Sequence, residues 1–151
     1  MYLAKSSHEK FEEFYRDFFD AREITVPKIE IYARRGAGLI TRILNINGIT
    51  FGRRIFIRPQ LMKRSEDERL YAPKTLIAHE LAHVLQYQKL GFLKFFYTYL
   101  KGYWQALKTK EKWDLNARME AYLEIPHEVE ARQFAADFLA WLENRQNKIE
   151  N

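Results

Sequence analysis

The sequence predicts an α+β fold, in which a small antiparallel sheet with a hairpin packs on a central helix and further helices follow. Between residues 24 and 58, β-branched residues recur in the alternating pattern of strands. After residue 73, apolar residues recur at helical spacing for most of the remaining chain. The central helix contains the pattern H-E-x-x-H, formed by His79, Glu80 and His83.

The composition indicates one soluble globular domain over residues 1–151. Hydrophobic residues make up 47% of the chain and charged residues 30%, which is typical of a chain that buries a single core. There is no cysteine, so disulfides and thiolate zinc sites are excluded. Any bound metal must therefore have His, Asp or Glu ligands.

Charge and hydropathy narrow the expected location and partners. No secretory signal and no apolar run of membrane-spanning length is present, so the cytoplasm is the default location, although non-classical export needs no such signal. The net charge is +5, and the longest basic runs are the pairs Arg34-Arg35 and Arg53-Arg54. This pattern favours a solvated surface, and the alternative is a nucleic-acid or anionic-membrane role. No feature predicts an oligomeric state.

The first elements are a helix and a strand. Residues 7–20 are predicted to form an amphipathic helix, because Ser6 and Glu9 make a capping box and aromatic residues follow at helical spacing. Residues 24–32 alternate as a strand that Pro27 breaks or places at a sheet edge. Residues 34–38 are a predicted loop whose two glycines have the wrong spacing for a phosphate site.

A hairpin is predicted around Asn47-Gly48, the strongest short signal for a two-residue turn between strands. Its strands cover residues 39–46 and 49–58, and Pro59 ends the second. Gly52 indicates a bulge or a close backbone approach within that second strand. Residues 63–69 are rich in charge and are predicted to be a connection.

The motif helix is predicted over residues 73–90. His79 and His83 lie four residues apart, so one face of the helix presents both imidazoles to one metal ion. Glu80 lies to the side, where its carboxylate can reach a metal-bound water without binding the metal itself. Alternatively, both histidines are core residues with hydrogen-bond partners, but two of them flanking a Glu in an apolar helix favour zinc.

Three further helices are predicted after the motif. Residues 92–107 carry an aromatic stripe with lysines, which indicates a helix that packs on the core or roofs a cleft; the alternative is a membrane-surface or partner-binding helix. Residues 108–113 connect it to a short helix over residues 115–123, which Asp114 caps. The last helix covers residues 127–145, with Pro126 at its first turn.

The last helix offers the third protein ligand that catalytic zinc requires. Glu128 shares a face with Ala131, whose small side chain leaves room for the motif helix, so Glu128 is the preferred ligand. Glu130 lies on another face and is the preferred acceptor of a hydrogen bond from a ligating imidazole. The alternatives are that Glu130 or His127 is the ligand, or that no third protein ligand is present.

These motifs make the sequence recognisable. HELAHVLQYQ and IPHEVEARQFAADF together resemble the gluzincin branch of the zincin metallopeptidases, in which a Glu on a later helix completes H-E-x-x-H. Within that branch, the chain resembles the H-E-x-x-H peptidase domains of unknown function associated with bacterial contractile injection systems. These domains tend to carry a Gln shortly after the second His, and Gln86 occupies that place here. The second run also resembles phage anti-repressor metalloproteases. Arg132 departs from the related patterns, which often have Asp or Asn there.

The resemblance implies a zincin-like fold with one Zn²⁺ per chain, bound by His79, His83 and Glu128, and Glu80 as general base. The expected function is zinc-dependent hydrolysis of a peptide or protein by a metalloendopeptidase, with the substrate added as a strand beside residues 49–58. A non-catalytic zincin-like binding module and a protease acting on DNA-bound proteins are the alternatives.

Hydrolysis by this route also needs a hydrogen-bond donor for the oxyanion that forms as water attacks the carbonyl. Several side chains near the two motifs carry a suitable donor, and the sequence does not choose among them. The preferred candidates are Tyr122 and His127, and the others are Tyr87 and Arg132.

Overall fold

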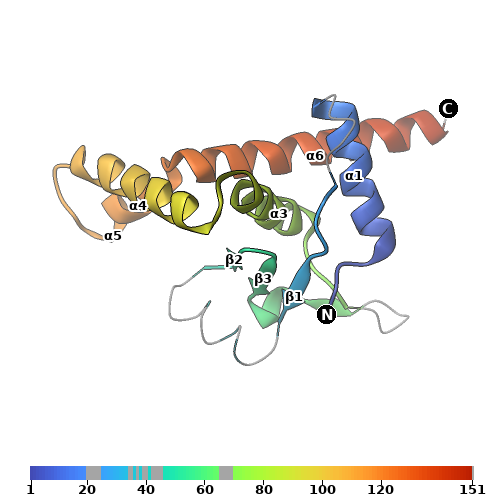
Figure 1. Cartoon of the computed structure of the whole chain (residues 1–151), viewed down its shortest axis with the longest axis horizontal. Coiled ribbons are helices and arrows are strands. Elements are labelled where there is room, and N and C mark those ends of the chain that lie inside the picture. The colour runs from blue at the N-terminus through green and yellow to red at the C-terminus, as the bar shows by residue number, and fades with distance from the viewer. Residues whose placement is uncertain are drawn as a thin grey trace.

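The computed structural model describes residues 1–19, 25–33, 36, 38, 41, 46–64 and 70–150. It has the predicted α+β character, with small sheets and more extensive helices (Figure 1). Its elements, in chain order, are α1 (Lys5–Phe19), β1 (Glu30–Tyr32), β2 (Gly48–Phe51), β3 (Arg54–Ile57), the 3₁₀ helix η1 (Pro59–Leu61), β4 (Lys63–Arg64), β5 (Leu70–Tyr71), α3 (Lys74–Leu90), α4 (Phe92–Lys108), α5 (Leu115–Leu123) and α6 (Pro126–Glu150).

The main sheet is mixed, which corrects the prediction of an antiparallel sheet. Its strand order is β1-β3-β2, with β1 parallel to β3 and β2 antiparallel to β3. Residues 33–53, which include β2, separate β1 from β3, and a connection of this length allows a parallel pairing that no short turn could make. Strand β3 is therefore the central strand, and β2 is an outer one.

The hairpin forms, but its turn lies five residues later than predicted. Phe51 pairs with Arg54, so the two-residue loop is Gly52-Arg53, and Gly48 is already the first residue of β2. Gly52 has a φ of 60°, a left-handed conformation that glycine adopts without a steric cost. Gly52, which was predicted to mark a bulge or a close backbone approach within the second strand, is therefore the first residue of the turn.

Asn47-Gly48 makes no turn because no strand precedes it at the described positions. Thr41, inside the predicted strand 39–46, is helical, and Ile46 belongs to no strand; residues 39, 40 and 42–45 lie outside the described residues. Gly36 and Gly38 are also helical, so the predicted loop 34–38 is wrong at those positions; residues 34, 35 and 37 lie outside the described residues. A turn dipeptide specifies a hairpin only when both flanking segments pair.

Two shorter predictions also change. The strand predicted over residues 24–32 forms only at β1; Pro27, which has no backbone N–H to donate, lies before it, and Ile24 falls outside the described residues. The predicted connection 63–69 begins with β4, which pairs with β5 in a separate two-stranded ladder. Residues 65–69 of that connection are among those the structure leaves undescribed.

The helix predictions are confirmed more closely, because a helix depends on neighbours in the sequence. Helix α1 begins two residues before the predicted start, and α6 extends to Glu150 rather than ending at residue 145. Asp114 caps α5 as predicted, since its carboxylate accepts a hydrogen bond from the backbone N–H of Ala117 at 2.9 Å. No helix in the described ranges is both long and apolar enough to cross a membrane.

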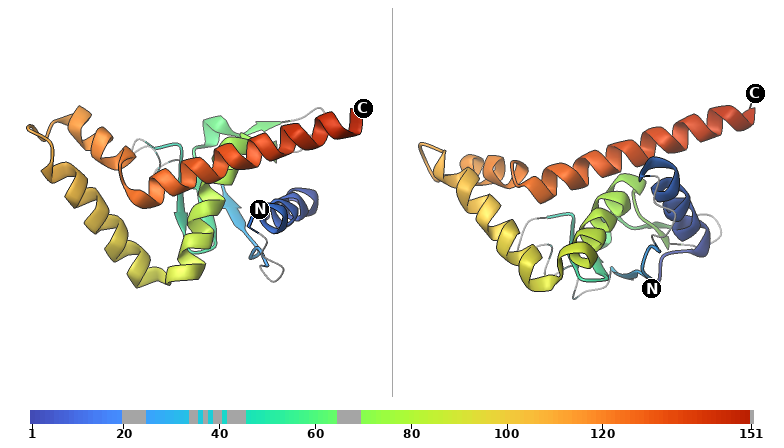
Figure 2. Two further views of the ribbon diagram at one scale, coloured as in Figure 1. Left: turned by 90° about the horizontal axis from the view of Figure 1, so that it is seen from above. Right: turned by 45° about the horizontal axis from the view of Figure 1, so that its top comes forward.

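Helix α3 lies between the main sheet and α6, as Figure 1 and the right view of Figure 2 show. Leu81 of α3 is fully buried, and so is Ala131 of α6, whose small side chain allows the two helices to pack closely. Helix α1 packs farther along α6, where the rings of Phe11 and Phe138 stack with their centres 4.2 Å apart. This packing places the first turn of α6 beside the middle of α3.

Candidate metal centre

The H-E-x-x-H residues lie in the middle of α3, in its most buried part. Glu80 and His83 are buried, and the His79 side chain is 19% exposed. The helix rises one turn between the two histidines, so their Nε2 atoms come within 3.2 Å of each other. Glu80 leaves the helix in a different direction, toward β2.

The first turn of α6 places Glu128 against both imidazoles. The Nε2 atom of His79 lies 3.2 Å from Glu128 Oε2, and the Nε2 atom of His83 lies 3.2 Å from Glu128 Oε1. Glu128 is 2% exposed, so its carboxylate is held there by packing as well as by its partners. The structure therefore brings together the three residues that were predicted as ligands.

These three residues could hold a metal ion, and they form such a group within the described part of the chain. Ligand atoms around a tetrahedral zinc, with bonds of about 2.0–2.1 Å, lie roughly 3.3 Å from one another. The nitrogen–nitrogen and nitrogen–oxygen distances of 3.2 Å fit that spacing. Two imidazoles and one carboxylate are also a donor set that zinc accepts.

The electrostatics of this group favour a cation between its members. Burial alone would raise the pKa of Glu128, but hydrogen bonds with His79 and His83 outweigh burial and hold the pKa below its usual range. Burial would lower the pKa of His83, yet the Glu128 carboxylate raises it overall. Glu128 is therefore ionised at neutral pH, and a metal ion would displace the proton that it attracts to His83.

His79, His83 and Glu128 are called the ligand group below. Glu80 is not part of it and is held by the sheet instead. Thr50 of β2 donates its hydroxyl hydrogen to Glu80 Oε2 at 2.7 Å, and the same hydroxyl lies 3.2 Å from the backbone carbonyl of Glu80. Burial raises the pKa of Glu80, an effect that the nearby His83 and Thr50 only partly oppose. A carboxylate whose pKa is raised in this way is a candidate to accept a proton and return it.

Gly48 makes room for that carboxylate. A Cβ atom built on Gly48 would lie 2.5 Å from Glu80 Oε1, closer than real side chains allow. The glycine of the Asn47-Gly48 pair is therefore required for close packing against α3 and not for a turn.

A chain of hydrogen bonds that begins at Nδ1, the ring nitrogen that does not face Glu128, orients the imidazole of His83. His83 Nδ1 lies 2.8 Å from Gln86 Oε1, so its N–H donates to the amide and the Nε2 lone pair faces Glu128 and the candidate metal position. The Gln86 amide nitrogen donates to Glu130 Oε2 at 2.8 Å and to the His127 carbonyl at 3.1 Å. The predicted contact between Glu130 and an imidazole is therefore indirect, since Gln86 lies between them.

Two tyrosines complete the surroundings of Glu128. Tyr99 of α4 donates to Glu128 Oε1 at 2.7 Å, and Tyr122 of α5 donates to Oε2 at 2.9 Å. Burial, followed by the Glu128 charge, raises the pKa of both phenols, so both remain donors. Tyr122 was predicted from the sequence as a candidate donor to the oxyanion. Tyr99 was not singled out, because nothing in the sequence distinguishes Tyr99 from the other aromatic residues of α4.

The remaining oxyanion candidates point elsewhere. His127 Nε2 lies 2.7 Å from Thr98 Oγ1, and its ring stacks on Phe95 of α4. Tyr87 packs on Phe95, and burial raises its pKa to about 12. Arg132 donates to the backbone carbonyl of Leu123. Of the four candidates, Tyr122 is the one that contacts the ligand group.

A comparison with protein-family models matches the eCIS core domain over residues 6–91. The chain belongs to the eCIS core domain family. This membership links it to extracellular contractile injection systems, in agreement with the resemblance found in the sequence. Comparison with the curated proteins and with the solved structures gives no match.

The match covers α1, the main sheet and α3, and so includes His79, Glu80, His83 and Gln86. It ends at Gly91, where α3 gives way to α4. Glu128, Tyr99 and Tyr122 lie beyond it. In this eCIS core domain, the ligand group therefore combines two residues from the matched region with one from the helices that follow.

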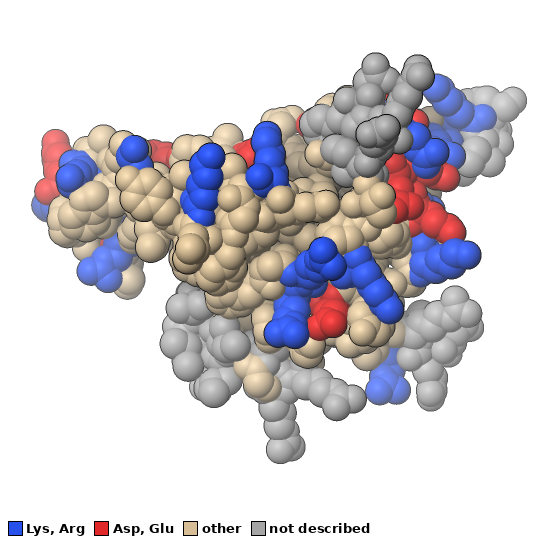
Figure 3. Space-filling model, in the orientation of Figure 1, with Lys and Arg blue, Asp and Glu red and all other residues tan. Residues whose placement is uncertain are grey.

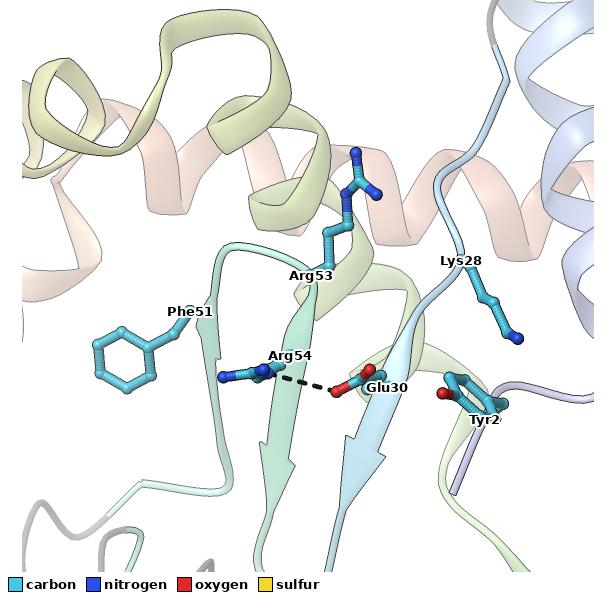
Figure 4. A pocket seen from close by; sticks show the side chains of 6 residues that line it. All are labelled: Tyr2, Lys28, Glu30, Phe51, Arg53 and Arg54. Atoms are coloured by element: carbon cyan, nitrogen blue, oxygen red, sulfur yellow. Dashed lines mark hydrogen bonds and ion pairs between the residues drawn. The ribbon is translucent and has the colours of Figure 1, made fainter.

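A separate pocket lies at the turn end of the sheet, away from the ligand group (Figure 4). The Arg54 Nε atom forms an ion pair with Glu30 Oε2 at 3.3 Å, and the Lys28 ammonium lies 4.0 Å from the centre of the Tyr2 ring. Phe51 and Arg53 complete the lining. Its lining includes no residue of the ligand group.

Gln86→Leu should weaken metal binding by about 10–100-fold, the usual effect of removing a partner that orients a metal ligand. Leucine cannot accept the Nδ1 hydrogen of His83, so the imidazole loses both its tautomer preference and its orientation. The measurement is a competition titration with a chromogenic zinc chelator.

Gln88→Leu is the matched control, because Gln88 lies on the same helix but is exposed. The control should bind zinc like the wild type. Equal zinc affinities for Gln86→Leu and the wild type would show that His83 needs no orienting partner.

Proposed function

We propose that this protein is a zinc-dependent metalloendopeptidase of zincin-like architecture. One observation carries the proposal: His79, His83 and Glu128 converge at metal-ligand spacing, while the buried carboxylate of Glu80 stands apart from them. A purely structural metal site would have no use for that second carboxylate. The division into three ligands and one separate base supports hydrolysis.

The chemistry divides between a bound cation and the protein. When bound, zinc would lower the pKa of a water molecule to about 7 and polarise the substrate carbonyl. Glu80 takes the proton of the attacking water, as its raised pKa and its position near the ligand group favour. Glu80 then delivers that proton to the amine that leaves. Thr50 keeps the carboxylate in position throughout.

The tyrosines provide the hydrogen bond to the developing oxyanion. Tyr99 and Tyr122 both reach Glu128 with their hydroxyl groups, and a cation bound to that carboxylate would compete for its lone pairs. A phenol released from Glu128 in this way remains at the ligand group with a hydrogen to donate. We assign this role to Tyr122, because it contacts Glu128 Oε2, the oxygen that faces His79, the more exposed of the two histidines.

The substrate is a peptide that lies beside β2. Of the predicted strand 49–58, the β3 half is internal to the main sheet, and only the β2 half is an outer strand. Thr50 of β2 contacts Glu80 directly, so a peptide backbone paired with this strand would pass the base.

The first test is metal content followed by turnover. Elemental analysis after dialysis against a weak chelator should give one zinc per chain, and the zinc protein should cleave members of a peptide library. A strong chelator should stop cleavage, and added zinc should restore it. A chain that binds zinc but cleaves no peptide would favour a non-catalytic binding module.

Gly48→Ala should lower kcat by about a hundredfold with zinc content unchanged. The added methyl would meet Glu80 Oε1 at 2.5 Å, so the carboxylate must move away from Thr50. A misplacement of about 1 Å at a reacting group costs roughly this factor. Peptide cleavage and zinc content are measured on the same preparation.

Gly36→Ala serves as the control, since a Cβ at Gly36 meets no atom within 4 Å. If Gly48→Ala retained wild-type kcat, the close packing of β2 on Glu80 would have no catalytic role.

A further inference from the structure

Helix α4 is apolar on two opposite sides. Its inner side, which includes Phe95, packs on α3 and on the first turn of α6. Its outer side also carries large apolar residues, which recur at intervals of four, three and four and so share one face. Their exposed fractions are 83% for Leu93, 66% for Tyr97, 58% for Leu100 and 46% for Trp104.

Positive charge accompanies this outer face. Between Glu80 and Glu111 the sequence contains no acidic residue. Lys94, Lys101 and Lys108 are exposed and follow one another at intervals of seven, along the edge of the apolar face. The ion pairs of the described residues include none of these three, and Lys108 instead lies 5.4 Å from the centre of the Trp104 ring.

The exposed apolar surface continues beyond the end of α4. Trp113, 50% exposed, meets Trp104 edge to face with ring centres 5.3 Å apart, and Leu115 at the start of α5 is 82% exposed. Figure 2 shows α4 and α5 extending away from α1 and the sheet. In Figure 3 this part of the molecule is mostly uncharged, with separate basic side chains along it and acidic side chains at its far end.

We propose that the outer face of α4 binds the surface of an anionic lipid bilayer, with the helix parallel to the membrane plane. An interfacial helix needs an apolar face, basic residues beside it and aromatic residues of mixed polarity, and α4 has all three. Lysine side chains can keep their ammonium groups at the headgroups while their methylene stems cover apolar surface.

Charge complementarity is what selects the bilayer as the partner. The lysines of the outer face have one sign, lie in a row and take part in no carboxylate ion pair within the described part of the chain. Each lysine near an anionic membrane surface contributes roughly fivefold to binding. Tyr97 and Trp104 belong to the two residue types that concentrate at the level of lipid headgroups.

The proposal also places the ligand group relative to the membrane. Tyr99 lies on the inner side of α4 and contacts Glu128, whereas Tyr97 points outward. The ligand group therefore lies on the far side of α4, about one helix diameter, roughly 10 Å, from the bilayer. Membrane binding does not depend on metal or on turnover.

The test is co-sedimentation of the full chain with vesicles. Wild type should bind vesicles of phosphatidylcholine mixed with phosphatidylserine, should not bind pure phosphatidylcholine, and should dissociate as salt is raised. Leu100→Glu should weaken binding at least tenfold, and Lys101→Glu at least fivefold. Both positions are exposed, so folding is retained, and circular dichroism verifies this.

Tyr71→Glu and Lys63→Glu are the matched controls, because they make the same charge changes at exposed positions of β5 and β4. Both controls should bind vesicles like the wild type. The proposal is overturned if wild type binds no anionic vesicles, or if the controls lose as much binding as the α4 variants. It is also overturned if the α4 variants leave vesicle binding intact and alter only self-association in sedimentation velocity, which would mark a protein interface.

Discussion

Glu80→Gln should reduce peptide hydrolysis by about a thousandfold while zinc binding and folding are preserved. General acid–base catalysis contributes roughly 10²–10⁴-fold, and glutamine cannot accept the proton of the attacking water. The amide has the shape of the carboxylate, and its oxygen can accept the hydrogen bond that Thr50 gives to Glu80. Burial already disfavours the charged form of Glu80, so a neutral side chain costs the fold little.

Three measurements on one preparation separate the outcomes of this substitution. They are kcat on a cleaved peptide, zinc content and the midpoint of thermal unfolding. Glu143→Gln, on the exposed distal part of α6, is the control for the change itself. Full activity in Glu80→Gln would exclude Glu80 as the base, and a loss of zinc would show that its role is to support the metal.

Glu128→Ala should abolish stoichiometric zinc binding, with an affinity loss well beyond a hundredfold. Removing a group that merely orients a ligand costs about 10–100-fold, and here a ligand itself is lost. The substitution also takes the shared acceptor away from Tyr99 and Tyr122, whose hydroxyls contact Glu128 at 2.7 and 2.9 Å. Leaving buried donors unpaired costs about 1–3 kcal/mol each, so the variant should also unfold at a lower temperature.

Glu130→Ala distinguishes the two carboxylates of α6. Glu130 accepts a hydrogen bond from Gln86 and contacts neither imidazole in the described interactions, so its removal should lower zinc affinity without removing zinc at equimolar concentration. Elemental analysis and calorimetric titration of both variants provide the comparison. One zinc retained in Glu128→Ala and lost in Glu130→Ala would reverse the assignment of the third ligand.

The family match covers the two histidines of the ligand group but not Glu128. The matched residues 6–91 contain both histidines and the candidate base, but the carboxylate that completes the ligand group comes from α6. Tyr99 and Tyr122, which hold that carboxylate, also come from the helices after Gly91. The helices beyond the matched region are therefore needed to form the ligand group.

Local periodicity was sufficient to predict the helices and the geometry of the H-E-x-x-H pair. His79 and His83 face the same way because four residues make about one helical turn, whatever surrounds them. The inward direction of Glu128 could be predicted from the same periodicity, because Glu128 shares a face with Ala131, and the small Ala131 marks the side of α6 that packs closely on α3. In both cases the residues that carry the prediction, His79 with His83 and Glu128 with Ala131, lie within about one helical turn of each other.

The tertiary structure decided everything that depended on distant pairing. Gly48 and Thr50 meet Glu80 only because β2 packs against α3, and the turn moved to Gly52 because hairpin formation requires two strands that pair. Tyr99 resembles the other aromatic residues of α4 until α4 packs beside α6 and brings its hydroxyl to Glu128. Such contacts join residues 29 or more positions apart, and their formation depends on the packing of whole elements, which no local pattern encodes.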